Sequence, residues 1–139
     1  QEYVEILLDK KYRQNLEKYA DYMETNKIKM LTIQDEKYPQ KLGNLYDPPS
    51  VLYVAGNIDI LNSRAIAIIG SRACTEYGKQ VAKEFAYNLS KSNINIISGL
   101  AKGIDTYAHI GTINASKPTI AVVGGGLDNI YPKENLRTV

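Results

Sequence analysis

Hydrophobic and polar positions alternate differently in the two halves of the chain, and the change comes near residue 64. Over 8–23, apolar residues recur at helical spacing between charged ones, which predicts an amphipathic helix with one stripe to bury. The stretch "IKMLTI" at 28–33 alternates apolar and polar residues and predicts a short strand. The stretch 38–57 is rich in turn residues and contains prolines that forbid a continuous helix, although 51–55 has the composition of a strand.

After residue 64 the pattern becomes regular. The predicted elements are a strand at 65–69, a helix around 75–91 in which Tyr77, Val81, Phe85 and Leu89 recur every four residues, a strand at 94–98, a helix at 103–115 and a strand at 119–126. This alternation is typical of a βαβαβ unit with right-handed crossovers. We therefore expect an α/β fold, with a Rossmann-like parallel sheet and helices on both faces, preceded by a helical and turn-rich lead-in.

The same patterns predict a division of the chain into three parts. Residues 1–27 are interpreted as a helical remnant of an N-terminal module, and 28–63 as a lead-in segment that packs on the sheet. Residues 64–139 are interpreted as the first part of a Rossmann-like domain. Because the chain starts with glutamine and stops soon after the third predicted strand, we expect a fragment whose sheet is incomplete at the C-terminus.

Three glycine-containing loops follow the three predicted strands, and parallel strands all end at the same edge of their sheet. The candidate phosphate-binding residues of these loops are Gly70, Ser71, Arg72, Ser98, Gly99, Lys102, Gly103, Gly124 and Gly125. Glycines let backbone N–H groups approach a ligand, and helix N-termini add partial positive charge. Arg72 and Lys102 add full charges. The hydroxyls of Ser71 and Ser98 either donate to phosphate or tie their own loops, and both interpretations are open.

Charge and composition narrow the function class. Residues 1–63 carry 8 Lys and Arg against 10 Asp and Glu, whereas 64–139 carry 9 against 5. The basic excess thus lies in the predicted sheet, as anion binding requires, although a solvated basic face gives the same count. The sequence contains no run of about 18 apolar residues and no signal-peptide pattern, so we expect a cytoplasmic protein without a membrane partner. With one cysteine, we expect neither a metal site nor a cofactor.

Familiar cofactor and catalytic signatures are not matched. The loop "GSRACTEYG" is not G-x-G-x-x-G, and "GLAKGID" is not a Walker motif. An enzyme could use Asp105 and His109, which lie one helical turn apart, but capping by Asp105 and locking of the loop by His109 are the simpler interpretations. Cys74 has no obvious base beside it. We therefore expect no catalytic residues and no enzyme.

The ordered motifs "YPQKL", "DPPSVLYVAGN", "IGSR", "TEYGK", "ISGLAKGIDTYAH" and "TIAVVGGGLDNIYPKEN" resemble the DprA/Smf family of DNA-processing proteins from about residue 28 to 135. The resemblance implies an extended Rossmann-like domain that binds single-stranded DNA without catalysis. It also implies DNA recombination in natural transformation, with a RecA-type recombinase loaded onto the incoming strand. A homodimer, formed through a surface beyond residue 139, is implied for the full-length protein.

The chain departs from the family pattern at Lys102, where the family often has arginine, so that a bidentate phosphate grip becomes a point charge. The alternative function is a small-nucleotide enzyme such as a phosphoribohydrolase, which needs a carboxylate beside the sugar. Glu76 and Asp105 are the acids near the predicted loops. The tyrosines near these loops either stack on bases or pack against the protein, and they are Tyr77, Tyr107 and Tyr131.

Overall fold

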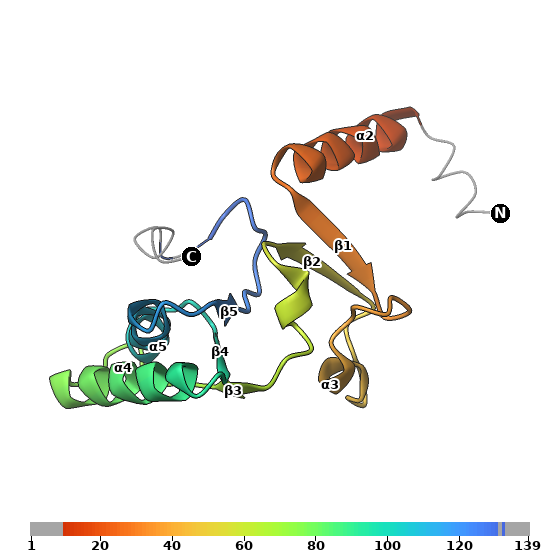
Figure 1. The fold of residues 1–139 in the computed structure, drawn as a ribbon. Coiled ribbons are helices and arrows are strands. Elements are labelled where there is room, and N and C mark those ends of the chain that lie inside the picture. The colour runs from red at the N-terminus through yellow and green to blue at the C-terminus, as the bar shows by residue number, and fades with distance from the viewer. Residues whose placement is uncertain (1–9, 131, 133–139) are drawn as a thin grey trace. The chain divides into compact units, whose positions relative to one another are not determined.

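The computed structural model describes residues 10–130 and 132, and it divides the chain into two compact units, Gln1–Ile58 and Asp59–Val139 (Figure 1). None of the described helices combines the length and apolar character that a membrane crossing requires. The three-part division of the sequence stays a prediction, because compactness places one boundary between Ile58 and Asp59.

The first unit is built on a two-stranded sheet. Helix α2 (Lys10–Thr25) leads into β1 (Ile28–Thr32), which pairs antiparallel with β2 (Val51–Ala55). The short helix α3 (Gln40–Gly43) lies in the connection between the two strands (Figure 1). The predicted helix and strands are confirmed, whereas the pairing of these two strands with each other was not predicted from the sequence.

Side chains of the β1–β2 connection hold it in place. The Asp35 carboxylate accepts hydrogen bonds from the Thr32 N–H at 2.6 Å and the Thr32 hydroxyl at 2.7 Å, and these bonds lower the pKa of Asp35. The Tyr38 ring is buried, and its hydroxyl donates to the Pro49 carbonyl at 2.6 Å. The turn-rich stretch is therefore a structured connection, which explains how two short strands meet in register.

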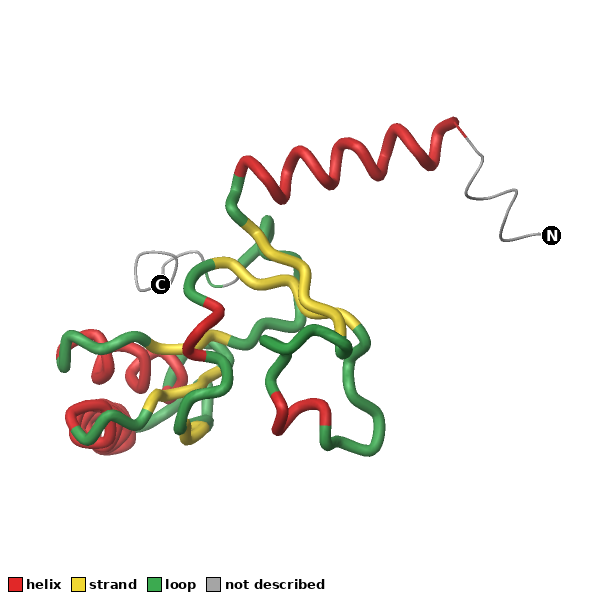
Figure 2. Tube along the Cα trace, turned by 45° about the vertical axis from the view of Figure 1, so that its right-hand side comes forward, coloured by secondary structure: helices red, strands yellow, loops and turns green. Residues whose placement is uncertain are grey.

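The second unit contains a three-stranded parallel sheet in the order β3-β4-β5. Its strands are β3 (Ala65–Ala67), β4 (Asn95–Ser98) and β5 (Thr119–Ala121), and its crossover helices are α4 (Glu76–Lys91) and α5 (Ile104–Asn114), shown in red in Figure 2. A 3-10 turn, η1 (Ile58–Ile60), precedes the sheet. The predicted α/β class with a parallel βαβαβ unit is confirmed.

The crossover helices α4 and α5 pack against each other and both contact β4. Consecutive strands joined by right-handed crossovers place both helices on one face of the sheet. The buried cluster on this face contains Ala86, Ile96 and Ala108. Within residues 59–130, α4 and α5 are the α-helices. Helices were expected on both faces of the sheet, and the described residues place them on one face.

The helices approach closely because small residues lie where they cross. A Cβ atom added to Gly111 would overlap the Lys83 carbonyl of α4 and lie 2.9 Å from the Cβ of Ala86. Nearby, the buried Ser90 hydroxyl donates to the Thr112 hydroxyl at 3.2 Å. The face of α4 that packs therefore carries small side chains, whereas Phe85 on a neighbouring face is 62% exposed.

Candidate functional site

A cavity of about 390 Å³ lies where the loops after β3, β4 and β5 meet. The residues that line it come from all three loops and are Arg72, Ala73, Gly99, Ala101, Lys102, Val123, Gly124, Gly125, Gly126, Asn129 and Ile130. Arg72 and Lys102 are both exposed. Among the described residues of this lining none is Asp or Glu, so the fixed side-chain charge on the cavity is positive.

In the first loop, only the arginine of the three candidate residues lines the cavity. The Ser71 hydroxyl accepts a hydrogen bond from the Ala73 N–H at 3.2 Å, which ties the loop to itself. A Cβ added to Gly70 would lie 2.7 to 3.0 Å from three side-chain atoms of Ile104. Position 70 therefore needs a glycine for packing against α5.

In the second loop, Gly99 and Lys102 line the cavity and Ser98 does not. The Ser98 hydroxyl is buried and donates to the Ile68 carbonyl at 2.6 Å, which joins β4 to the end of β3. The Gly99 N–H donates to the Asp105 carboxylate at 3.1 Å. The positive charge that the second loop contributes to the cavity is therefore that of the Lys102 side chain.

The third loop presents open backbone. A Cβ added to Gly124 or Gly125 would meet no atom within 4 Å, so the loop leaves space beside both residues. Sequence reasoning missed Gly126, Asn129 and Ile130 in the same lining. These residues carry no charge signal, although the run of three glycines pointed to the region. Three further lining residues were not predicted because they too are uncharged, and they are Ala73, Ala101 and Val123.

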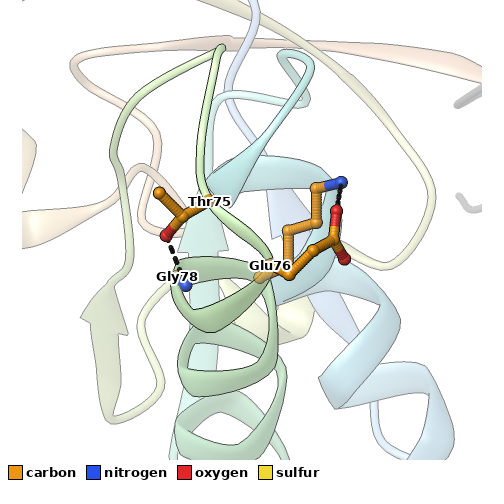
Figure 3. Close-up of polar contacts among 4 residues, drawn as sticks. Thr75, Glu76 and Gly78 are labelled. Atoms are coloured by element: carbon orange, nitrogen blue, oxygen red, sulfur yellow. Dashed lines mark hydrogen bonds and ion pairs between the residues drawn. The ribbon is translucent and has the colours of Figure 1, made fainter.

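The N-terminus of α4 beside the first loop is capped, as Figure 3 shows. The Thr75 hydroxyl accepts a hydrogen bond from the Gly78 N–H at 3.1 Å. Glu76 pairs with Lys79 at 2.5 Å, and this hydrogen bond to the carboxylate raises the pKa of Lys79. Glu76, one of the two acids near the predicted loops, is therefore already paired with a lysine of its own helix.

The tyrosines near the loops do not line the cavity in the described part of the chain. Tyr77 on α4 is 78% exposed. The ammonium of Lys79 lies 5.6 Å from the centre of the Tyr107 ring, which joins α4 to α5 by a cation–π contact. Tyr131 lies outside the described residues. Base stacking by these tyrosines stays a prediction.

His109 and Asp105 contact different partners. The Thr119 hydroxyl donates to the Ile96 carbonyl at 2.9 Å, so its proton is used and the His109 Nδ1–H donates to it at 2.8 Å. Burial lowers the pKa of His109, and the nearby Asp105 partly opposes this shift. The Asp105 carboxylate binds the Gly99 amide instead. His109 is thus a neutral, fully buried structural residue, but it fastens α5 to the strand β5 and does not lock a loop as predicted. The predicted capping by Asp105 is wrong in the same way, because the N-cap of α5 is Gly103, with no side-chain hydrogen bond.

The chain is similar to proteins of one family. The model of the family described as DNA recombination-mediator protein A matches residues 29–139. DNA processing protein DprA of Streptococcus pneumoniae is 42% identical over 114 residues, which cover 82% of this chain and 40% of that relative. The chain spans about two-fifths of the length of this relative and of a similar DprA from Bacillus subtilis.

Two solved structures share the fold. The X-ray structure of DNA processing protein A from Streptococcus pneumoniae aligns with a TM-score of 0.74 and 39% identity, over 85% of this chain and 42% of that one. A structure of DNA processing protein A from Helicobacter pylori, described for its single-stranded DNA binding mode, aligns with a TM-score of 0.69 and 34% identity. This alignment covers 80% of this chain and 49% of that one.

Proposed function

The chain belongs to the DNA recombination-mediator protein A family, and from this premise we propose that it binds single-stranded DNA at the cavity of the second unit. The observation that carries the proposal is the placement of two exposed cationic side chains and an open glycine backbone on one cavity lined by no described acid. Phosphate is the anion that such a surface attracts along a nucleic-acid strand.

In this proposal, the phosphate is held by Arg72, Lys102 and the backbone of Gly124 and Gly125. Two backbone amides near the cavity contribute less, because the Ile104 N–H at the start of α5 donates to the Ser71 carbonyl at 3.2 Å and the Gly99 N–H in the loop after β4 donates to Asp105. Binding therefore depends on side-chain charge more than on a helix N-terminus.

The cavity has the size of a small-ligand pocket. A volume of about 390 Å³ is at the lower end of the range for such pockets, so we expect it to hold one phosphate group of a strand with its sugar or base. Contacts to phosphate fix the position of a strand but carry no information on its sequence. We expect binding that is tolerant of base sequence and sensitive to salt.

We propose a binding function without catalysis. A phosphoribohydrolase needs a free carboxylate at the sugar, whereas the Glu76 carboxylate is paired with Lys79 and the Asp105 carboxylate accepts the Gly99 N–H. Loading of a RecA-type recombinase and homodimerisation of a longer chain are further proposals, which rest on the family resemblance. A cytoplasmic location is a further proposal that rests on the sequence pattern.

The test is a titration of the full chain with fluorescently labelled oligonucleotides of mixed sequence, single-stranded and duplex, from 50 to 300 mM salt. The expected result is tighter binding of the single strand, with an affinity that falls steeply with salt and changes little with base composition. A strong preference for one duplex sequence would contradict the proposal. Release of free base from nucleoside monophosphates would favour the alternative function, a phosphoribohydrolase.

A further inference from the structure

The start of α5 is in backbone contact with the loop that carries Arg72. Gly103, just before α5, has a φ of 83°, and a Cβ there would overlap the Ser71 carbonyl and lie 2.8 Å from the Cα of Arg72. The next residue, Ile104, donates its N–H to the Ser71 carbonyl at 3.2 Å. That carbonyl belongs to the peptide bond that leads into Arg72, so the first residue of α5 orients this bond.

The next two residues of α5 hold the loop that carries Lys102. Asp105 is buried and accepts the Gly99 N–H at 3.1 Å. The Thr106 hydroxyl donates to the Ala101 carbonyl at 2.7 Å. This carbonyl belongs to the peptide bond that leads into Lys102. Each cationic residue of the cavity thus follows a peptide bond whose carbonyl is bound by the first turn of α5.

We propose that residues 104–106 are positioning residues that set the orientation of Arg72 and Lys102 toward one bound phosphate. The inference rests on the proposed function, because it assigns a role in single-strand binding to residues that do not line the cavity. One helical turn that fastens both loops fixes the separation of the backbone positions from which the two cationic side chains extend before the ligand arrives, which reduces the ordering cost of binding.

The Thr106 hydroxyl gives the sharpest test. Thr106→Val keeps the shape of the side chain and removes the hydrogen bond to Ala101, whereas Thr106→Ser keeps the hydroxyl. We expect Thr106→Val to weaken binding of a single-stranded oligonucleotide about threefold to tenfold, the range of one hydrogen bond, and Thr106→Ser to restore it. The matched control is Thr112→Val, on the same helix, where the hydroxyl contacts the Ala108 carbonyl and the Ser90 hydroxyl of α4 and not a loop of the cavity.

Measuring Thr106→Val in the Lys102→Ala chain as well as in the unchanged chain distinguishes positioning by Thr106 from a purely structural role. If Thr106 acts through Lys102, then Thr106→Val changes affinity little in the Lys102→Ala chain, although it lowers thermal stability equally in both backgrounds. Losses of affinity that add in the two backgrounds would overturn the inference. So would an effect of Thr112→Val on affinity as large as that of Thr106→Val.

A measurement without DNA completes the test. The backbone amide of Gly99 should exchange with solvent faster in Asp105→Ala than in the unchanged chain, whereas Asp105→Asn retains an acceptor and the protection. The amide NMR signal of Lys102 should shift in Thr106→Val and return in Thr106→Ser. Unchanged signals would overturn the positioning role even if the strand binds. Failure of the unchanged chain to bind single strands would overturn the proposed function, and the NMR result would still decide the positioning.

Discussion

Replacing Arg72 by alanine removes one of the two cationic side chains on the cavity while leaving the hydrogen bonds of the Ser71 backbone in place. For a single strand, each phosphate contact contributes about 0.7 to the slope of log affinity against log salt. One lost contact therefore lowers the magnitude of the slope by about 0.7. If the variant and the unchanged chain bind equally at 1 M salt, the variant should bind about fivefold more weakly than the unchanged chain at 0.1 M. The defect should shrink as salt rises.

Lys102 tests whether the two charges act on the same phosphate. Lys102→Ala should produce a similar loss, Lys102→Arg should hold or raise affinity because a guanidinium grips phosphate bidentately, and Lys102→Glu should cost more than alanine. Independent contacts predict a loss of about 25-fold at 0.1 M salt for the double change Arg72→Ala with Lys102→Ala. Two charges on one phosphate predict a smaller combined loss, because neighbouring sites couple.

The assay is fluorescence anisotropy with a labelled single strand at five salt concentrations, accompanied by a thermal melt of each variant. Lys41→Ala, an exposed lysine of the first unit, is the control for the loss of one positive charge elsewhere. An unchanged salt slope for Arg72→Ala, together with an unchanged melting temperature, would remove Arg72 from the site. Strictly additive losses would mean that the two side chains contact different phosphates.

Three further predictions concern the scaffold. Gly111→Ala should lower stability by about 1–3 kcal/mol, because its Cβ overlaps an α4 carbonyl, whereas Gly125→Ala, with open space around it, should leave the melting temperature unchanged. Burial holds the pKa of His109 below its ordinary value of 6.5, so the unfolded state takes up a proton at a higher pH than the folded state does. The free energy of unfolding should therefore fall as the pH drops below 6.5, by at most about 1.4 kcal/mol per pH unit. Thermal melts from pH 5 to 8 would measure this dependence, and His109→Gln should remove it. Thr75→Ala should cost about 1 kcal/mol through loss of the α4 cap, and Thr75→Ser should retain most of it in a denaturant titration.

The order of helices and strands could be predicted because it depends on local patterns. Apolar runs ending in glycine give the strands of the second unit, and Thr75 begins α4 as a capping residue should. The face of α4 that packs could not be predicted in this way. Phe85 belongs to the most hydrophobic repeat of the helix, yet the structure buries Ala82 and Ala86, because a close helix crossing needs small side chains.

The convergence of three loops on one region could also be predicted, since parallel strands end at one edge. The reason for each glycine could not. Gly70 makes room for the Ile104 side chain, and Gly103 makes room for the Ser71 carbonyl, so both are required by residues about thirty positions away in the sequence. Gly124 and Gly125 have open space beside them and fit the expected approach of a ligand. Only the tertiary structure separates these two kinds of glycine.

The way in which the cavity offers positive charge decides whether a bound DNA strand can shift along it. A phosphate held by the free amides of a helix N-terminus sits at one fixed point with short, directional hydrogen bonds. Here the first amide of α5 and the Gly99 amide are already bonded within the protein. What faces the cavity is two long cationic side chains and an open glycine backbone. Cationic groups on flexible side chains follow a phosphate over a wider range of positions, so one strand would occupy the cavity in successive registers. Sequence tolerance and strong salt dependence would then have the same cause.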